Sequence, residues 1–537
     1  MVMTDRHIRA TFRRYYLHLL LAILVTLVWR LPKGRLLFLG MEYEDSYVYT
    51  VVARQILEGN HIGEGAASYL TTVCDVGSLT ACESSSTYSG HYIGSSYVFS
   101  LAARVLGYWP AIAGLVGIAA SCVTVVFIFL IARLLFDSDD IPIFSVAAFA
   151  MTPVFAVHGV AAYAEPLSNM CVTIGMFMYL RYVYSPRAER TRIWEISTLC
   201  TWSFTLLFAI LVKRENLILA FVLPLVSIIR LTAQCDLKTT WRRVGAASLG
   251  SGLAVAFSLL LLRFDEVFVN ETAEFQRLPF GLTQVRTLLP MFFRSFCVTS
   301  WYSLGIVWVL LGLYLIRRYD YRALYPLAAI LTYLSLYVSH VRSYYQVNYG
   351  DVTPADTLRY SMNFMTMWAL LAGVGLASVV RACLSTGWGV RWRMAIVTIS
   401  LVIYSAAAYR YTTALRGNLT SEEQRARIEP SAVASRFAVA LGPVDTYVVT
   451  LEPLLVQMYG SPNVNVIALT RFDAQLIEAL ASQHAYLNFL YVDSAIYRND
   501  IDRLRYRPQL HFLESLERKS LYRNDQFEIF MLRAPSP

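Results

Sequence analysis

The chain has 537 residues, of which 56% are hydrophobic and 14% aromatic, and its mean hydropathy is +0.48. This composition excludes an ordinary soluble domain, and the repeated apolar runs predict an α-helical polytopic membrane protein. The formal net charge of +9 does not indicate a nucleic-acid partner. The basic residues gather between the apolar runs, where orientation in a membrane accounts for them.

The first apolar run, Tyr15–Trp29, follows four arginines and ends without a small-x-small cleavage pattern. It therefore predicts an uncleaved signal anchor with the N-terminus inside. Ten further runs of suitable length follow, so about eleven spans are expected. The ten are Ala111–Phe136, Ile141–His158, Leu167–Tyr184, Ser197–Val212, Leu217–Ile229, Val244–Leu262, Trp301–Ile316, Tyr321–Val341, Ser361–Val380 and Met394–Tyr409.

The loops that this count places inside are rich in arginine and lysine, which agrees with the positive-inside rule. One inner loop, which contains Asp139 and Asp140, is acidic and does not fit. The outer side then holds a loop over residues 30–109, with an interfacial helix near Tyr92–Trp109, and a tail after about residue 410. Cys74 and Cys82 share the first outer loop, where a disulfide is expected, although two free thiols remain an alternative.

The tail, residues 411–537, predicts a small extracytoplasmic α/β domain with a largely parallel sheet, beside a membrane domain over residues 1–410. Strand-like runs alternate there with a helical run. The strands are expected at Thr446–Thr450, Val464–Leu469, Leu487–Val492 and Phe527–Leu532, and the helix at Ala474–Ala485. No glycine-rich phosphate loop occurs in the tail, so no nucleotide site is assigned to it.

Three acidic residues fall at the predicted outer interface. Glu44 and Asp45 begin a helical stretch whose apolar residues share one face, and this face is expected to lie in the membrane interface. Glu165 begins the fourth span. Helix capping is the plain explanation of all three, because negative charge favours a helix N-terminus. A carboxylate at the edge of a span is also a candidate for chemistry on a lipid-borne substrate.

Several cations fall on the same predicted outer face. Lys213 and Arg214 lie between the fifth and sixth spans, in a loop predicted to lie outside, where the positive-inside rule disfavours cations. Their presence there indicates an anionic partner such as phosphate. The alternative is that the span count is wrong at this point. Arg342 and Arg359-Tyr360 flank another outer loop, where snorkelling to the headgroups is the plain alternative. His91 and His158 are weaker candidates for substrate contact.

The chain resembles the GT-C superfamily of integral membrane glycosyltransferases, especially its protein O-mannosyltransferase and aminoarabinose-transferase branch. The stretches that carry the resemblance are short. They are Glu44-Asp45-Ser46-Tyr47 with Ala53-Arg54, Gly90-His91-Tyr92-Ile93-Gly94, Ala164-Glu165-Pro166, Lys213-Arg214-Glu215 and Arg359-Tyr360.

The resemblance implies a polyprenyl-phosphate-sugar donor bound where the spans meet the outer interface. It implies Asp45 as catalytic base, with Glu44 the close rival, and Glu165 as the second acidic position. Lys213 and Arg359 match positions that contact the donor phosphate. Some relatives use a divalent metal such as Mg²⁺ or Mn²⁺ and others do not, and Glu42, Glu44 and Glu165 are the oxygen ligands available for one.

The function predicted from these residues is inverting transfer of a sugar from a polyprenyl phosphate to the hydroxyl of a lipid, glycan or protein acceptor. A carboxylate takes the acceptor's proton and cations stabilise the departing phosphate. The predicted location is the bacterial inner membrane, or the endoplasmic reticulum membrane in a eukaryote. The rival is a transporter or flippase of a lipid-linked sugar, which the lack of an internal repeat disfavours.

Overall fold

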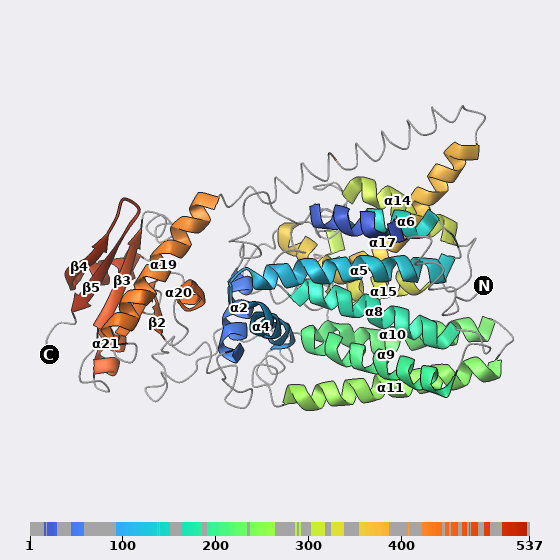
Figure 1. Cartoon of the computed structure of the whole chain (residues 1–537), viewed down its shortest axis with the longest axis horizontal. Coiled ribbons are helices and arrows are strands. Elements are labelled where there is room, and N and C mark those ends of the chain that lie inside the picture. The colour runs from blue at the N-terminus through green and yellow to red at the C-terminus, as the bar shows by residue number, and fades with distance from the viewer. Residues whose placement is uncertain are drawn as a thin grey trace. The chain divides into compact units, whose positions relative to one another are not determined.

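Figure 1 shows the computed structural model of the chain, which falls into two compact units. One comprises residues 1–34, 114–262 and 273–418, and the other residues 35–113, 263–272 and 419–537. The structure describes residues 19–28, 44–57, 93–136, 140–150, 164–184, 191–233, 237–263, 302–316, 324–337, 354–385, 421–442, 446–450, 453–459, 464–469, 474–481, 488–494 and 507–533, with a few isolated positions such as Ser138 and Phe472.

The first unit is a bundle of helices (Figure 1). Within the described ranges, a helix lies at each of the first ten predicted spans, and the eleventh, Met394–Tyr409, falls almost wholly outside them. The elements after Leu19–Val28 are α5 (Ile112–Phe136), α6 (Asp140–Ala150), α8 (Ala164–Tyr184), α9 (Arg192–Val212), η4 (Arg214–Ile218), α10 (Leu219–Ala233), α11 (Leu237–Arg263), α14 (Tyr302–Leu315), α15 (Leu324–Leu336) and α17 (Pro354–Ser385).

Four helices in the described part of the chain are long and apolar enough to cross a membrane: α5, α9, α11 and α17. They differ in how much protein surrounds them. The apolar windows of α5 and α17 are 61% and 72% buried, whereas those of α9 and α11 are 39% and 33% buried. Large apolar side chains such as Phe204 and Phe257 stay exposed on the outer pair. We infer that α5 and α17 form the interior of the bundle, while α9 and α11 face lipid.

Glycines allow α17 to pack unusually close to its neighbours. A Cβ atom at Gly375 would overlap the backbone of Trp308 in α14, and one at Gly312 would overlap the backbone of Leu371 in α17. A Cβ atom at Gly373 would meet Ser145 of α6, whose backbone nitrogen would lie only 2.7 Å away. Close backbone approach through small residues is the usual way in which membrane helices associate, because burial of apolar surface gains little in lipid.

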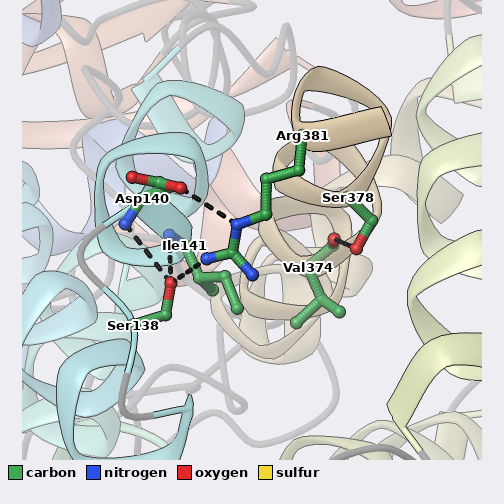
Figure 2. Close-up of polar contacts among 6 residues, drawn as sticks. All are labelled: Ser138, Asp140, Ile141, Val374, Ser378 and Arg381. Atoms are coloured by element: carbon green, nitrogen blue, oxygen red, sulfur yellow. Dashed lines mark hydrogen bonds and ion pairs between the residues drawn. The ribbon is translucent and has the colours of Figure 1, made fainter. Parts of the chain in front are cut away.

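The start of α6 is tied to the end of α17 by the polar contacts in Figure 2. The Arg381 guanidinium donates from Nε to Asp140 Oδ2 over 3.0 Å and from Nη2 to Ser138 Oγ. Ser138 Oγ also accepts the backbone N–H groups of Asp140 and Ile141 at 3.3 and 3.4 Å. The acidic loop predicted to lie inside thus meets a cation from another loop predicted to lie inside, at one end of the bundle.

In the second unit, the C-terminal region contains a five-stranded sheet in the order β2-β1-β3-β5-β4. The strands are β1 (Thr446–Thr450), β2 (Asn465–Ala468), β3 (Asn488–Ser494), β4 (Glu517–Arg523) and β5 (Phe527–Arg533). Strand β1 pairs in parallel with β2 and β3, whereas β5 is antiparallel to both β3 and β4. The sheet is therefore mixed, and a polar edge strand that the sequence pattern did not predict completes it.

Helices cover both faces of this sheet. Alternate residues of each buried strand point to opposite sides, so Val448 and Leu490 join one core and Phe489 and Tyr491 the other. The first core is closed by α19 (Ser421–Leu441) and α20 (Pro453–Tyr459), and the second by α21 (Ala474–Ala481) and α23 (Arg507–Ser515). The predicted α/β domain is present as a three-layer arrangement.

The second unit also includes two helices from the predicted first outer loop, α2 (Glu44–Leu57) and α4 (Ile93–Leu106). The interfacial helix expected near Tyr92–Trp109 corresponds to α4. The apolar face of α2, which was expected to lie against lipid, packs instead against α19 and α20. The predicted domain boundary near residue 410 stays a prediction, and residues 35–113 group with the C-terminal region.

Candidate functional site

Buried polar side chains gather where four elements of the first unit meet: the start of α8, the turn between α9 and α10, the end of α15 and the start of α17. The topology expected from the sequence places all four at the outer face. Polar groups removed from water are costly unless they bond one another. This cluster is therefore a candidate functional site.

A buried ion pair lies at the centre of the cluster. Lys213 Nζ donates to Glu165 Oε1 over 3.0 Å, and both side chains are almost completely buried. Glu165 lies in the first turn of α8, where the helix dipole favours a negative charge. Lys213 is the residue that ends α9, and its ammonium also lies 6.0 Å from the centre of the Tyr337 ring. The carboxylate and the ring together stabilise a cation in this position.

The backbone breaks between α9 and α10 so that these side chains can enter the cluster. Lys213 has an extended conformation, with φ −159° and ψ 112°, and a short 3₁₀ turn, η4, follows before α10 begins. Its backbone N–H still donates to Ala209 O, which closes α9. The turn buries Glu215 and Asn216 beside Lys213. Three of the four polar residues between these two apolar runs, Lys213, Glu215 and Asn216, are therefore buried in the bundle.

Asn216 is the hub of the hydrogen bonds. Its Nδ2 donates to Ala209 O over 2.8 Å, as a second hydrogen bond to that carbonyl near the end of α9, and to Ser168 Oγ over 2.9 Å. Its Oδ1 accepts from the Tyr333 hydroxyl over 2.7 Å. Both amide hydrogens and the carbonyl oxygen are therefore used. This single side chain connects α8, α9 and α15.

A second asparagine completes a closed ring of contacts, which consists of hydrogen bonds and one stacked pair of tyrosines. Ser168 Oγ donates to Asn363 Oδ1 over 3.1 Å, and Asn363 Nδ2 donates to the Tyr337 hydroxyl. The Tyr337 ring stacks on Tyr333, with centres 6.4 Å apart and planes 16° from parallel. The contacts that start at Tyr333 therefore end at Tyr337, four positions further along the chain. A ring that joins α8, η4, α15 and α17 fixes their relative positions at this end of the bundle.

Two side chains in the same region keep hydrogen-bonding capacity. Among the described residues, Glu215 Oε2 and both polar atoms of the Asn169 amide are buried and have no hydrogen-bond partner. Such atoms are costly to bury alone, so they mark positions suited to a polar ligand or ordered water. This end of the bundle therefore combines a buried cation with polar atoms that have no hydrogen-bond partner among the described residues.

The structure brings two predicted site residues together: Glu165 and Lys213 are each other's partners. Arg214 lies in η4 beside them. Glu44 and Asp45 begin α2, and Arg359 and Tyr360 lie near the start of α17, but only the backbone at these four positions is described. Other predicted residues lie outside the described ranges: Glu42, Cys74, Cys82, His91, His158 and Arg342.

Sequence reasoning missed most of the hydrogen-bonded ring. Ser168, Asn216, Tyr333, Tyr337 and Asn363 were not singled out, because an isolated polar residue near the end of an apolar run resembles an ordinary interfacial residue. One signal was available for Asn216, which directly follows the charged residues of the break. The partners of the others lie as many as 195 positions away in the sequence.

The described residues do not fit a metal site. No group of three His, Cys, Asp or Glu side chains within the described part of the chain is arranged to hold an ion. One oxygen of Glu165 is committed to Lys213, and the side chains of Glu42 and Glu44, the other two predicted ligands, are not among those described. The metal ligands suggested earlier therefore gain no support from this cluster.

Comparison of the sequence with protein-family models and with curated proteins finds no match. Solved structures do match. ArnT from Cupriavidus metallidurans bound to undecaprenyl phosphate superposes with a TM-score of 0.57 and 13% identity, over 97% of this chain and 98% of that one. The oligosaccharyltransferase AglB from Archaeoglobus fulgidus, in complex with an inhibitory peptide and a dolichol-phosphate, gives 0.57 and 11% identity over 94% and 72%.

A further structure of the Archaeoglobus fulgidus oligosaccharyltransferase, in complex with Zn and sulfate, gives a TM-score of 0.53 and 12% identity over 96% of this chain and 72% of that one. At such identities the likeness establishes the fold. The agreement covers nearly the whole chain, including both the helical bundle and the C-terminal sheet. The chain therefore has the fold of the GT-C integral membrane glycosyltransferases, as its short motifs indicate.

Proposed function

We propose that this protein is a glycosyltransferase that moves a sugar from a polyprenyl-phosphate-linked donor to an acceptor hydroxyl at the outer face of the membrane. The observation that carries the proposal is the fold shared along 97% of the chain with a structure bound to undecaprenyl phosphate. A second neighbour is bound to a dolichol-phosphate. Two structures with this fold thus hold a lipid phosphate, which makes it the expected donor carrier here.

The reaction we propose is a single displacement. The acceptor oxygen attacks the anomeric carbon while the bond from that carbon to the phosphate oxygen breaks. Asp45, or Glu44 in its place, takes the proton of the acceptor hydroxyl, and the polyprenyl phosphate leaves with the electron pair. Attack opposite the leaving group inverts the configuration at the anomeric carbon.

Cations at the outer end of the bundle are proposed to stabilise the departing phosphate. Lys213, Arg214, Arg342 and Arg359 are the candidates, with Tyr360 as a hydroxyl donor. Lys213 is the best supported, because its ammonium is buried and is held by Glu165 Oε1 at this end of the bundle. In this arrangement Glu165 orients the lysine and does not accept the substrate proton itself. Glu215 and Asn169 supply hydrogen-bonding atoms for polar groups of the donor.

Transfer activity tests the proposal directly. The purified protein, reconstituted in liposomes, is supplied with a radiolabelled sugar on undecaprenyl or dolichyl phosphate together with pools of lipid, glycan and peptide acceptors. Labelled acceptor and free lipid phosphate are expected in equal amounts. Label that only crosses the sealed bilayer, still attached to its lipid, would instead identify a flippase.

The orientation is a separate proposal, with the N-terminus inside and the C-terminal domain outside. Reporter fusions at both ends test it. A cytoplasmic signal from the C-terminal fusion would remove the site from the outer face.

A further inference from the structure

Helix α2 is docked through its C-terminal half on the C-terminal region of the chain. Val51, Val52 and Ile56 of α2 are buried in one apolar cluster with three residues from α19 and α20. Those three are Ile428, Leu455 and Met458, and Leu455 and Met458 are completely buried. Helix α4 supports α2 from another side, where Ser96 Oγ donates to Tyr49 O over 3.1 Å. The helix is therefore held by protein between Tyr49 and Ile56.

A polar contact fixes the same junction. The carbonyl oxygen of Met458, in the last turn of α20, accepts from Arg54 Nη1 over 3.1 Å and from the Tyr108 hydroxyl over 3.2 Å. The last carbonyls of a helix lack partners within the helix and carry its negative dipole end, so a guanidinium is well suited to them. The Arg54 guanidinium also lies 4.8 Å from the centre of the Tyr108 ring, which orients it further.

The docked helix is the one that begins with Glu44 and Asp45. Asp45 lies nine positions before Arg54, which is about 13.5 Å along a helix. A helix is stiff over two to three turns, so a shift or rotation at Arg54 moves the first turn with it. Misplacement of a reacting group by 1 Å is enough to slow a reaction about 100-fold. The junction at Met458 thus controls the position of the two acids.

We propose that the C-terminal region positions helix α2, which carries the two acids. Helix α20 is the surface on which α2 packs, and Arg54 is a positioning residue. This inference rests on the function proposed above, in which Asp45 or Glu44 is the base. It assigns the C-terminal region a part in transfer that does not require it to touch the donor. Its loss is expected to lower turnover and to leave donor binding nearly unchanged.

Hydrogen exchange of the α2 amides in the full-length protein tests the docking without using activity. Arg54→Ala and Leu455→Ala are expected to speed exchange over residues 49–57 by about tenfold or more, since both remove contacts that hold the helix. Leu480→Ala is the matched control, because Leu480 is equally buried but belongs to the core under α21 and α23 and not to the apolar cluster that holds α2. It is expected to leave exchange in α2 unchanged. Equal exchange in wild type, Arg54→Ala and Leu455→Ala would overturn the proposal.

Kinetics then test positioning. Arg54→Ala is expected to lower kcat by about 10- to 100-fold with the donor KM within about twofold, as displacement of the base requires. Arg54→Lys should restore part of kcat, because the ammonium still donates to Met458 O. Tyr108→Phe keeps the ring beneath Arg54 and is expected to lower kcat less than Arg54→Ala does.

An equal fall of kcat in Leu480→Ala would overturn the positioning role, since general destabilisation of the protein would then explain the fall. Faster α2 exchange in a protein that transfers no sugar would overturn the proposed function while the docking stands.

Discussion

Lys213 and Glu165, 48 positions apart in the sequence, form an ion pair that is almost completely buried at one end of the helical bundle. The pair joins the end of α9 to the start of α8, so both helix ends lie at the same end of the bundle. Asp140 and Arg381 make the same kind of connection between α6 and α17. Two pairs from distant parts of the chain thus agree with the alternation of spans expected from the sequence.

Removal of one partner of the buried pair is expected to be costly. Lys213→Met or Glu165→Leu alone should lower the free energy of unfolding by about 3–5 kcal/mol, because the other charge is left uncompensated. The double variant Lys213→Met/Glu165→Leu should recover most of this loss, since an apolar pair needs no compensation. Unfolding in mixed micelles measures all three variants. Losses that simply add would show that the two side chains do not depend on each other.

Substitution of Asp45 separates catalysis from capping. Asp45→Asn keeps the size of the side chain and its ability to cap a helix, but it cannot accept the acceptor's proton. Turnover is expected to fall by roughly 100- to 10,000-fold, the usual range for loss of a general base. Glu44→Gln is the internal control and should be milder. Normal turnover by Asp45→Asn together with an inactive Glu44→Gln would make Glu44 the base, and two active variants would exclude the proposed site.

The packing of α17 provides a test of the bundle. Gly375→Ala is expected to destabilise the protein by about 1–3 kcal/mol, because the new methyl group overlaps the backbone of Trp308. Gly252→Ala in α11 is the matched control, since nothing lies within 4 Å of its Cβ position. It should stabilise by about 0.5–1 kcal/mol through helix propensity. Thermal unfolding of the two variants is expected to shift in opposite directions.

The contacts in Figure 2 differ in burial, and so should their contributions to stability. Ser138→Ala removes the hydroxyl that accepts two N–H groups at the start of α6 and is expected to cost about 1 kcal/mol. Asp140→Asn breaks a half-exposed ion pair with Arg381 and should cost less than about 1 kcal/mol. Unfolding midpoints of the two variants rank these effects. A larger loss of stability for Asp140→Asn would mean that the ion pair, and not the Ser138 cap, is the main link between the start of α6 and the end of α17.

Much of the fold follows from hydrophobic length and pattern. Strand β1 has the predicted bounds Thr446–Thr450, because five buried residues in a row after a turn give a clear signal. Helix α19 was not predicted, because its first half is highly charged and because Pro430, which lies inside it, is unusual in a helix. Strand β4 was missed because ERKSLYR contains almost no apolar residue. A strand of this kind is defined by its neighbour β5 and not by its own composition.

The charged residues of the candidate site could be predicted from the sequence, but the residues that they contact could not. Glu165 and Lys213 stood out because each is an ionisable residue at the edge of an apolar run. Their direct pairing depends on how α8 and α9 cross, and the ring through Asn216 and Asn363 depends on four elements at once. The docking of α2 on α20 was equally hidden, since an amphipathic helix beside a membrane has two plausible surfaces to cover.

The polar strand β4 also protects the sheet. As an edge strand it presents unpaired backbone groups, the usual starting point for pairing with another chain. Its sequence carries Glu517, Arg518, Lys519 and Arg523, and its pairing with β5 is irregular between Ser520 and Tyr522. Charges and bulges at an edge discourage the addition of a further strand. Copies confined to one membrane surface, where local concentrations are high, can therefore crowd together without their sheets merging into aggregates.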